Sequence, residues 1–125
     1  MWVQVFSHIP YNASMRKPPP LRRGDLIAIA AIASPIREEF LSRGVTELES
    51  LGFRCTHADT IFSRHRYLAG TDDRRAAELA MYLKDPEVKA VVFARGGFGS
   101  VRVIDRLGPQ AFRSPKVLCG YSDIT

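Results

Sequence analysis

The chain has 125 residues, of which 46% are hydrophobic and 25% charged, and this composition is ordinary for a globular domain. It excludes disordered, collagen-like and disulfide-scaffold chains, and no apolar run approaches the roughly 18 residues of a membrane span. The net charge is +5, but the basic residues stand in short pairs between acids, so neither a nucleic-acid partner nor a membrane partner is expected.

The first twenty residues lack the organised pattern of the rest. Residues 1–9 have no cationic start and no long apolar stretch, which argues against a signal peptide. Residues 18–20 are three prolines, which exclude a helix or a central strand. We expect residues 1–20 to be a poorly ordered tail, with the natural start at Met1 or Met15, and residues 21–125 to form one domain.

Strand-type and helix-type segments alternate from Leu21 onward. Apolar runs bounded by turn residues predict buried strands, and apolar residues at helical spacing predict helices. The predicted elements are a strand at 26–31, a helix from 34 to 52, a strand at 53–56, a helix from 71 to 85, a strand at 88–94, a helix at 100–107 and a strand at 116–119. This order predicts an α/β fold with an open, mostly parallel sheet and flanking helices, of Rossmann or flavodoxin type.

Local signals add detail to these elements. Ser34 and Thr71 are expected to be helix N-caps, and Cys119 is expected to be a buried apolar thiol because it ends an apolar run. Cys55 and Cys119 lack the spacing of a metal or redox site, so no metal or cofactor is predicted. Free cysteines fit the reducing cytoplasm.

The segment Arg95–Gly99, called here the glycine turn, lies between a predicted strand and a predicted helix. Its glycines let a ligand approach the backbone and leave N–H groups free for an anion. A dinucleotide fingerprint would need a third glycine where Arg102 stands. A tight structural turn, nucleotide binding and oxyanion or carboxylate binding all remain open on these residues alone.

The segment Gly120–Ile124, called here the elbow, resembles a nucleophile elbow, in which a serine hydroxyl is exposed on a sharp strand-to-helix turn. The signature is incomplete because Ile124 replaces the second glycine, and Ser122 as a plain N-cap is the alternative. Together with the glycine turn the pattern is stronger. The N–H of Asp123 and one from Gly97 or Gly96 would form a two-donor oxyanion hole.

A serine nucleophile needs a general base and a group that orients it. The histidines are His8 in the predicted tail and His57 and His65 in or near a polar loop, and no carboxylate is placed to orient either loop histidine. The residues therefore indicate one half of a hydrolase site.

Four motifs resemble, in order, the N-terminal domain of the LD-carboxypeptidases, serine peptidases that include murein tetrapeptide carboxypeptidases and microcin-immunity proteins. The motifs are Arg23–Asp25, Tyr67–Asp73 with Arg75 and Ala76, Arg95–Ser100 with Arg102, and Pro115–Lys116 leading to Gly120–Thr125. Two local departures are Ala31–Pro35, where the family tends to have Ala-Pro-Ser before Ser-Pro, and a shorter turn at Leu107–Pro109.

The resemblance implies that Ser122 is the nucleophile and that the N–H groups of Gly97 and Asp123 form the oxyanion hole. Arg95, Gly96 and Phe98 become candidates for substrate contact. The implied reaction is hydrolysis of the amide to a C-terminal D-amino acid in cytoplasmic murein peptides, as in peptidoglycan recycling. It needs no metal or organic cofactor, and family members act as dimers.

The family places its Glu and His in a second domain, and this chain stops three residues after Ser122. We therefore expect the 125 residues to be the nucleophile half of the enzyme, truncated after the elbow and inactive alone. Two alternatives remain. One is a non-catalytic module that uses Arg95 and the glycine turn to bind an anionic peptide or nucleotide; the other is a poorly folded fragment.

Overall fold

The computed structural model describes residues 16–125. Most of the predicted tail and both candidate starts lie outside them, and residues 16–20 form neither helix nor strand. The helices and strands are β1 (Leu26–Ala30), α1 (Glu38–Ser50), β2 (Arg54–His57), α2 (Asp72–Lys84), β3 (Val88–Phe93), α3 (Ser100–Leu107) and β4 (Val117–Cys119), with short 3-10 helices at Asp59–Phe62, Pro109–Phe112 and Ser122–Ile124.

The four strands form one parallel sheet in the order β2-β1-β3-β4. The predicted α/β fold is therefore confirmed, and the order is that of the first four flavodoxin-type strands. β1 and β3 lie in the centre, while β2 and β4 form the edges. The chain reverses its strand order between β1 and β3, and the loops beyond the carboxyl ends of these strands are where such sheets bind ligands.

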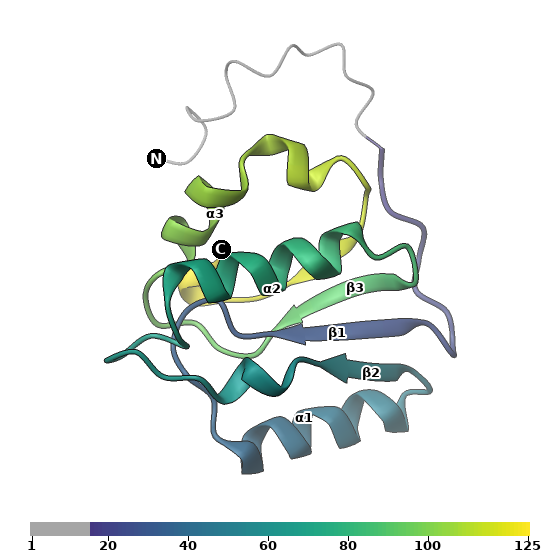
Figure 1. Cartoon of the computed structure of the whole chain (residues 1–125). Coiled ribbons are helices and arrows are strands. Elements are labelled where there is room, and N and C mark those ends of the chain that lie inside the picture. The colour runs from purple at the N-terminus through teal and green to yellow at the C-terminus, as the bar shows by residue number, and fades with distance from the viewer. Residues whose placement is uncertain (1–15) are drawn as a thin grey trace.

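Helices cover both faces of the sheet, with α1 on one face and α2 and α3 on the other (Figure 1). β1 supplies both cores by alternation: Ala28 and Ala30 face α2 and α3, whereas Ile29 faces α1. Alternating side chains point to opposite faces of a strand, so an apolar run is needed when both faces are buried. This explains why the sequence of β1 is continuously apolar.

Two predicted details of these elements are wrong. α1 begins only at Glu38, after Arg37, which makes no side-chain capping bond. Ser34 instead lies in the loop after β1, where its N–H donates to the carbonyl of Gly96 at 3.1 Å. Cys119 is exposed because β4 is an edge strand.

The predicted cap of the second helix is confirmed, since Thr71 Oγ1 accepts a hydrogen bond from the N–H of Arg74 at 3.2 Å. Of the helices among residues 16–125, not one combines the length and the apolar character needed to cross a membrane. Nor do three or more His, Cys, Asp or Glu side chains gather into a possible metal site within this range.

Candidate active site

Ser122 follows the edge strand β4 and has a left-handed backbone, with φ of +59°. Such a φ is uncommon for a residue other than glycine, and it is typical of a strained turn that exposes a side chain. The residue is exposed, and Ile124 behind it packs against the core under α2 and α3. Ile124, the departure from the usual elbow signature, thus anchors the turn in the core.

The glycine turn lies directly against the side chain of Ser122. A Cβ atom added at Gly96 would lie 2.9 Å from Ser122 Cβ and 3.3 Å from Ser122 Oγ, closer than a side chain tolerates. The neighbouring strands β3 and β4 bring these two segments together. The structure therefore joins the glycine turn and the elbow, which lie more than twenty residues apart in the sequence.

Gly97 is fixed in a conformation that other residues rarely adopt. Its φ is +116°, and an added Cβ would overlap Ser34 Oγ and lie 2.8 Å from Ser34 Cβ. The loop after β1 thus packs onto the glycine turn, with the hydrogen bond from Ser34 N–H to Gly96 as a second contact. Gly97 itself is exposed, so its backbone is accessible to a ligand.

The elbow is tied to the start of α3. Ser100 N–H donates to Asp123 Oδ2 at 3.0 Å, and Ser100 Oγ donates to the Asp123 carbonyl at 2.6 Å. The carboxylate of Asp123 thus caps the first residue of α3, where a negative charge is favourable. Among the hydrogen bonds within residues 16–125, none uses the backbone N–H of Gly97 or of Asp123 as donor. Within the described part of the chain, both predicted oxyanion donors therefore lack a hydrogen-bond partner.

The candidates for substrate contact behave differently from one another. Arg95 is exposed, and its Nη1 donates to the carbonyl of Pro35 at 3.3 Å, so it also braces the loop after β1. Phe98 is exposed beside Tyr67, with ring centroids 6.1 Å apart, and the Arg102 guanidinium lies 5.6 Å from its ring. Tyr67 thus contacts a candidate residue for substrate binding, although the sequence motif that contains it did not predict a functional role for it.

The structure brings no described histidine to Ser122. His57 ends β2, the edge strand opposite β4, so three strand spacings of about 4.8 Å separate the two edges. His65 is exposed in a bend where its backbone pairs with Leu68. His8 lies outside the described residues. The base of a serine hydrolase is thus not among the described neighbours of the elbow.

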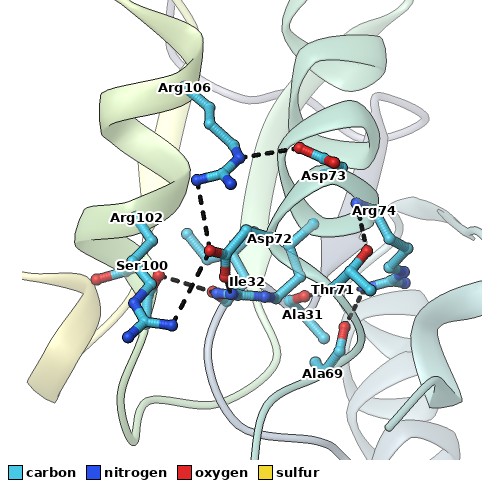
Figure 2. A network of polar contacts seen from close by, with 12 residues as sticks. Ala31, Ile32, Ala69, Thr71, Asp72, Asp73, Arg74, Ser100, Arg102 and Arg106 are labelled. Atoms are coloured by element: carbon cyan, nitrogen blue, oxygen red, sulfur yellow. Dashed lines mark hydrogen bonds and ion pairs between the residues drawn. The ribbon is translucent and has the colours of Figure 1, made fainter. Parts of the chain in front are cut away.

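A buried arginine network at the start of α2 supports the site (Figure 2). Arg75 is completely buried; its Nη1 donates to the carbonyls of Ile32 at 2.7 Å and Gly99 at 2.9 Å, and its Nη2 contacts Asp72. Burial lowers the pKa of Arg75, and the neighbouring Asp72 opposes that shift. As one of two adjacent arginines, Arg75 looks like a surface residue in the sequence. It nevertheless lies four residues before Leu79, and this spacing puts both side chains on the buried face of the helix.

The adjacent Arg74 serves other loops. Its Nη1 donates to the carbonyls of Ala31 at 3.1 Å and Ala69 at 3.0 Å, and its Nη2 lies 3.1 Å from Glu78 Oε2. Burial raises the pKa of Glu78 to about 7, and the neighbouring Arg74 guanidinium opposes that shift. The start of α2 therefore holds the loop after β1 through two arginines.

Comparison with known families identifies the protein family of this chain. The family model of the LD-carboxypeptidase N-terminal domain matches residues 27–125, which include all but the first residue of β1, the glycine turn and the elbow. This chain belongs to the LD-carboxypeptidase family. The predicted resemblance is thereby confirmed, and every candidate site residue of this LD-carboxypeptidase domain falls inside the matched range.

Relatives of this LD-carboxypeptidase domain are longer than the chain. A Bacillus subtilis protein named "Probable murein peptide carboxypeptidase" is 41% identical over 110 residues, which are 87% of this chain and 34% of that protein. The murein tetrapeptide carboxypeptidase of Pseudomonas aeruginosa is 34% identical over 79% of this chain and 33% of its own length. The chain thus spans about a third of the curated relatives that it matches.

Solved structures agree with the fold of the LD-carboxypeptidase domain. An MccF-like protein from Bacillus anthracis superposes with a TM-score of 0.81 at 29% identity, over 87% of this chain and 34% of that one. The parallel four-stranded sheet with flanking helices is therefore the arrangement of these relatives.

Proposed function

We propose that these 125 residues supply the nucleophile and the oxyanion hole of a serine LD-carboxypeptidase that removes a C-terminal D-amino acid from murein peptides. One observation carries the proposal. Ser122, in a left-handed conformation, lies against Gly96, between two segments whose Gly97 and Asp123 N–H groups have no partner within the described residues. The names of the B. subtilis and P. aeruginosa relatives support murein peptides as the substrate class.

The chemistry follows from acyl transfer at this site. Ser122 Oγ attacks the carbonyl carbon of the scissile amide, and the serine proton passes to a general base. The negative charge on the carbonyl oxygen is bound by the N–H groups of Gly97 and Asp123, each of which contributes about 3 kcal/mol to such a transition state. The C–N bond then breaks, the amine takes up the proton, and water hydrolyses the ester on Ser122.

The base comes from outside the described neighbours of Ser122. By the family resemblance, a His oriented by a Glu in a second domain takes this role. The exposed position of Ser122 leaves room for such a partner at the carboxyl end of the sheet. We accordingly expect the 125 residues by themselves to give no turnover.

Substrate contacts, compartment and assembly complete the proposal. Arg95 offers a cation near the glycine turn, and Phe98 with Tyr67 offers an exposed apolar surface beside it. We place the reaction in the cytoplasm, since Cys55 and Cys119 are both free thiols in the structure. By the family resemblance, the process is peptidoglycan recycling. By the family resemblance, the active form is a homodimer with neither nucleic-acid nor membrane partners.

The test uses a hybrid enzyme, in which the part of the B. subtilis relative that lies beyond its match to this chain is joined after Thr125. We expect the hybrid enzyme to release the C-terminal D-amino acid from a murein tetrapeptide. Ser122→Ala should lower kcat at least about 1,000-fold because the nucleophile is lost. Release of the amino acid is followed by chromatography.

Matched controls separate chemistry from folding. Ser114→Ala changes an exposed serine just before β4 and should leave kcat unaffected. A tetrapeptide with a C-terminal L-amino acid should not be cleaved. Turnover that survives Ser122→Ala, or a folded hybrid enzyme that binds the tetrapeptide without cleaving it, would contradict the proposal; the second outcome favours the non-catalytic module.

A further inference from the structure

Arg75 is a buried cation that the proposed chemistry does not use. Its side chain has no exposed surface, and a guanidinium is costly to bury unless its hydrogen bonds are satisfied. Here Nη1 donates to two main-chain carbonyls and Nη2 contacts the carboxylate of Asp72, while the buried Nε has no hydrogen-bond partner among the described residues. The positions of those two carbonyls indicate what the buried arginine does.

The two carbonyls belong to the two loops that meet at the site. Ile32 lies just after β1, and Gly99 is the last residue of the glycine turn and the N-cap of α3. An added Cβ at Gly99 would lie 2.7 Å from Arg75 Nη1, so the turn is packed onto the guanidinium. One side chain thus fixes the distance between the loop after β1 and the far end of the glycine turn.

The near end of the glycine turn depends on the same loop. Two residues after Ile32, the Ser34 N–H holds the carbonyl of Gly96, and the Ser34 side chain packs against Gly97. Gly97, which carries a proposed oxyanion donor, is therefore flanked by the Ser34 contacts on one side and by the bond from Arg75 to Gly99 on the other. A shift of about 1 Å in such a donor is enough to reduce catalysis strongly.

Asp72 links Arg75 to α3 by charge. Its Oδ1 contacts Arg75, while its Oδ2 lies 3.4 Å from Arg106 Nη1 and 4.0 Å from Arg102 Nη1 (Figure 2). The helix that follows the glycine turn is thus attached to the start of α2 by the same carboxylate that balances the buried guanidinium.

Arg74 shows what a purely structural arginine does at this place. It also donates through Nη1 to two carbonyls, but those are Ala31 and Ala69, and it makes no hydrogen bond to residues 95–99. Adjacent in sequence and similar in bonding, the two arginines differ in whether they contact the glycine turn. Arg74 is therefore a matched control for Arg75.

We propose that Arg75 is a positioning residue that holds the glycine turn so that the Gly97 N–H faces the elbow. The proposal rests on the function proposed above for that N–H. It predicts that loss of Arg75 loosens residues 96–99 and slows the chemical step. Loss of Arg74 should lower stability without either of these effects.

The first test measures backbone order in the 125-residue chain by 15N relaxation. In Arg75→Met we expect the order parameters of residues 96–99 to fall from about 0.85 to below about 0.6, and in Arg74→Met we expect them to stay near the original value. Arg75→Lys, which keeps a charged donor, should restore part of the order. Equal loosening in the Arg74 and Arg75 variants, or no loosening in either, would overturn the proposal.

If Arg75→Met fails to fold, the comparison of Arg75→Lys with Arg74→Lys tests the proposal instead. Arg75→Lys keeps a cation that reaches one carbonyl, and it is compared with Arg74→Lys at equal distance below each variant's melting temperature. Lower order at residues 96–99 in Arg75→Lys than in Arg74→Lys supports the proposal, and equal order overturns it.

The second test measures kinetics in the hybrid enzyme. Arg75→Met should lower kcat by about 10- to 100-fold, with KM changed less than about threefold, because the donor acts in the transition state. Arg74→Met should keep kcat within about threefold at matched stability. If the unsubstituted hybrid enzyme has no Ser122-dependent turnover, the proposed function fails, whereas unchanged kcat in an active Arg75→Met hybrid refutes the role of Arg75 alone.

Discussion

The two ends of the parallel sheet are held in different ways. At the carboxyl end, the buried Arg75 and the largely buried Arg74 bind the carbonyls of four loop residues. At the amino end, the partly buried Lys116 donates to the carbonyls of Asp85 and Val88, and the exposed Arg54 donates to that of Gly24 at 2.8 Å.

This difference predicts that contacts at one end set the geometry of the candidate site, whereas contacts at the other end contribute only to the stability of the fold. At the carboxyl end, cations bind carbonyls, and the Gly97 N–H of the proposed oxyanion hole has no hydrogen-bond partner within the described residues. At the amino end, cations bind the carbonyls of Asp85, Val88 and Gly24, and the proposed chemistry uses no group there. A lost contact at the amino end should lower stability alone, whereas loss of the Arg75 contacts at the carboxyl end should also displace catalytic groups.

The largest effect is expected at Gly97. In Gly97→Ala the new Cβ would overlap Ser34, and φ of +116° is strained for any L side chain. We expect the free energy of unfolding to fall by about 2 to 4 kcal/mol. Turnover of the hybrid enzyme should fall at least about 100-fold because the donor moves. Chemical denaturation and initial rates measure the two effects.

Two further variants sharpen the test at Gly97. Ser34→Gly combined with Gly97→Ala removes the overlap and should recover part of the stability. Gly44→Ala makes the same change inside α1, where nothing lies within 4 Å, and should raise stability by about 0.5 to 1 kcal/mol. Unchanged turnover in a Gly97→Ala hybrid enzyme would contradict the prediction, because it would show that catalysis does not depend on the position of the Gly97 N–H.

A pH effect of intermediate size is expected at Glu78, which lies under the carboxyl end beside Arg74. Burial raises its pKa to about 7 from an ordinary value of 4.5, so the folded protein binds the proton more tightly than the unfolded chain. Its contribution to stability is full below pH 4.5 and is lost as the pH rises through about 7. The loss amounts to about 3 kcal/mol.

Glu78→Gln should remove this pH dependence. Urea denaturation between pH 4.5 and 8 should show a smaller fall in unfolding free energy for the variant than for the original chain. Glu38→Gln, at an exposed position in the first turn of α1, should keep the fall of the original chain. Identical pH curves for Glu78→Gln and the original chain would contradict the prediction.

The smallest effect is expected at the amino end. Lys116 Nζ donates to the carbonyls of Asp85 at 2.5 Å and Val88 at 2.6 Å. Lys116→Met should therefore lower the free energy of unfolding by about 1 to 2 kcal/mol, measured by chemical denaturation. At a temperature where the variant is folded, kcat of the hybrid enzyme should not change.

The exposed Lys89 provides the control for Lys116. Its Nζ donates to the carbonyl of Pro86 alone, and Lys89→Met should cost at most about 0.5 kcal/mol. A large loss of kcat in Lys116→Met would erase the contrast between the two ends of the sheet.

The sequence allows the fold to be predicted because its local signals agree. The apolar run of β1, the Thr71 cap and the glycines after β3 each indicate the element that the structure contains. The order of strands makes an open parallel sheet the natural arrangement. The elbow and the glycine turn are therefore predictable as neighbours, since both follow parallel strands at the same end of the sheet.

Other features depend on tertiary contacts. The position of Ser34 is set by its packing on Gly97, which overrides its local preference to cap a helix. Cys119 is exposed because β4 lies at the edge, and the apolar pattern alone does not distinguish an edge strand from a central one. The burial of Arg75 depends on carbonyls 24 and 43 residues away along the chain.

The edge position of β4 has a kinetic consequence for the nucleophile. Its pairing with β3 comprises three register pairs, and Leu118 and Cys119 are exposed. A short strand with few buried contacts frays in local openings that cost less than global unfolding. We expect each opening to let the backbone of Ser122 relax and to separate Asp123 from Ser100. In the 125-residue chain, the geometry of the elbow should therefore be lost by fraying of β4 before the rest of the sheet unfolds.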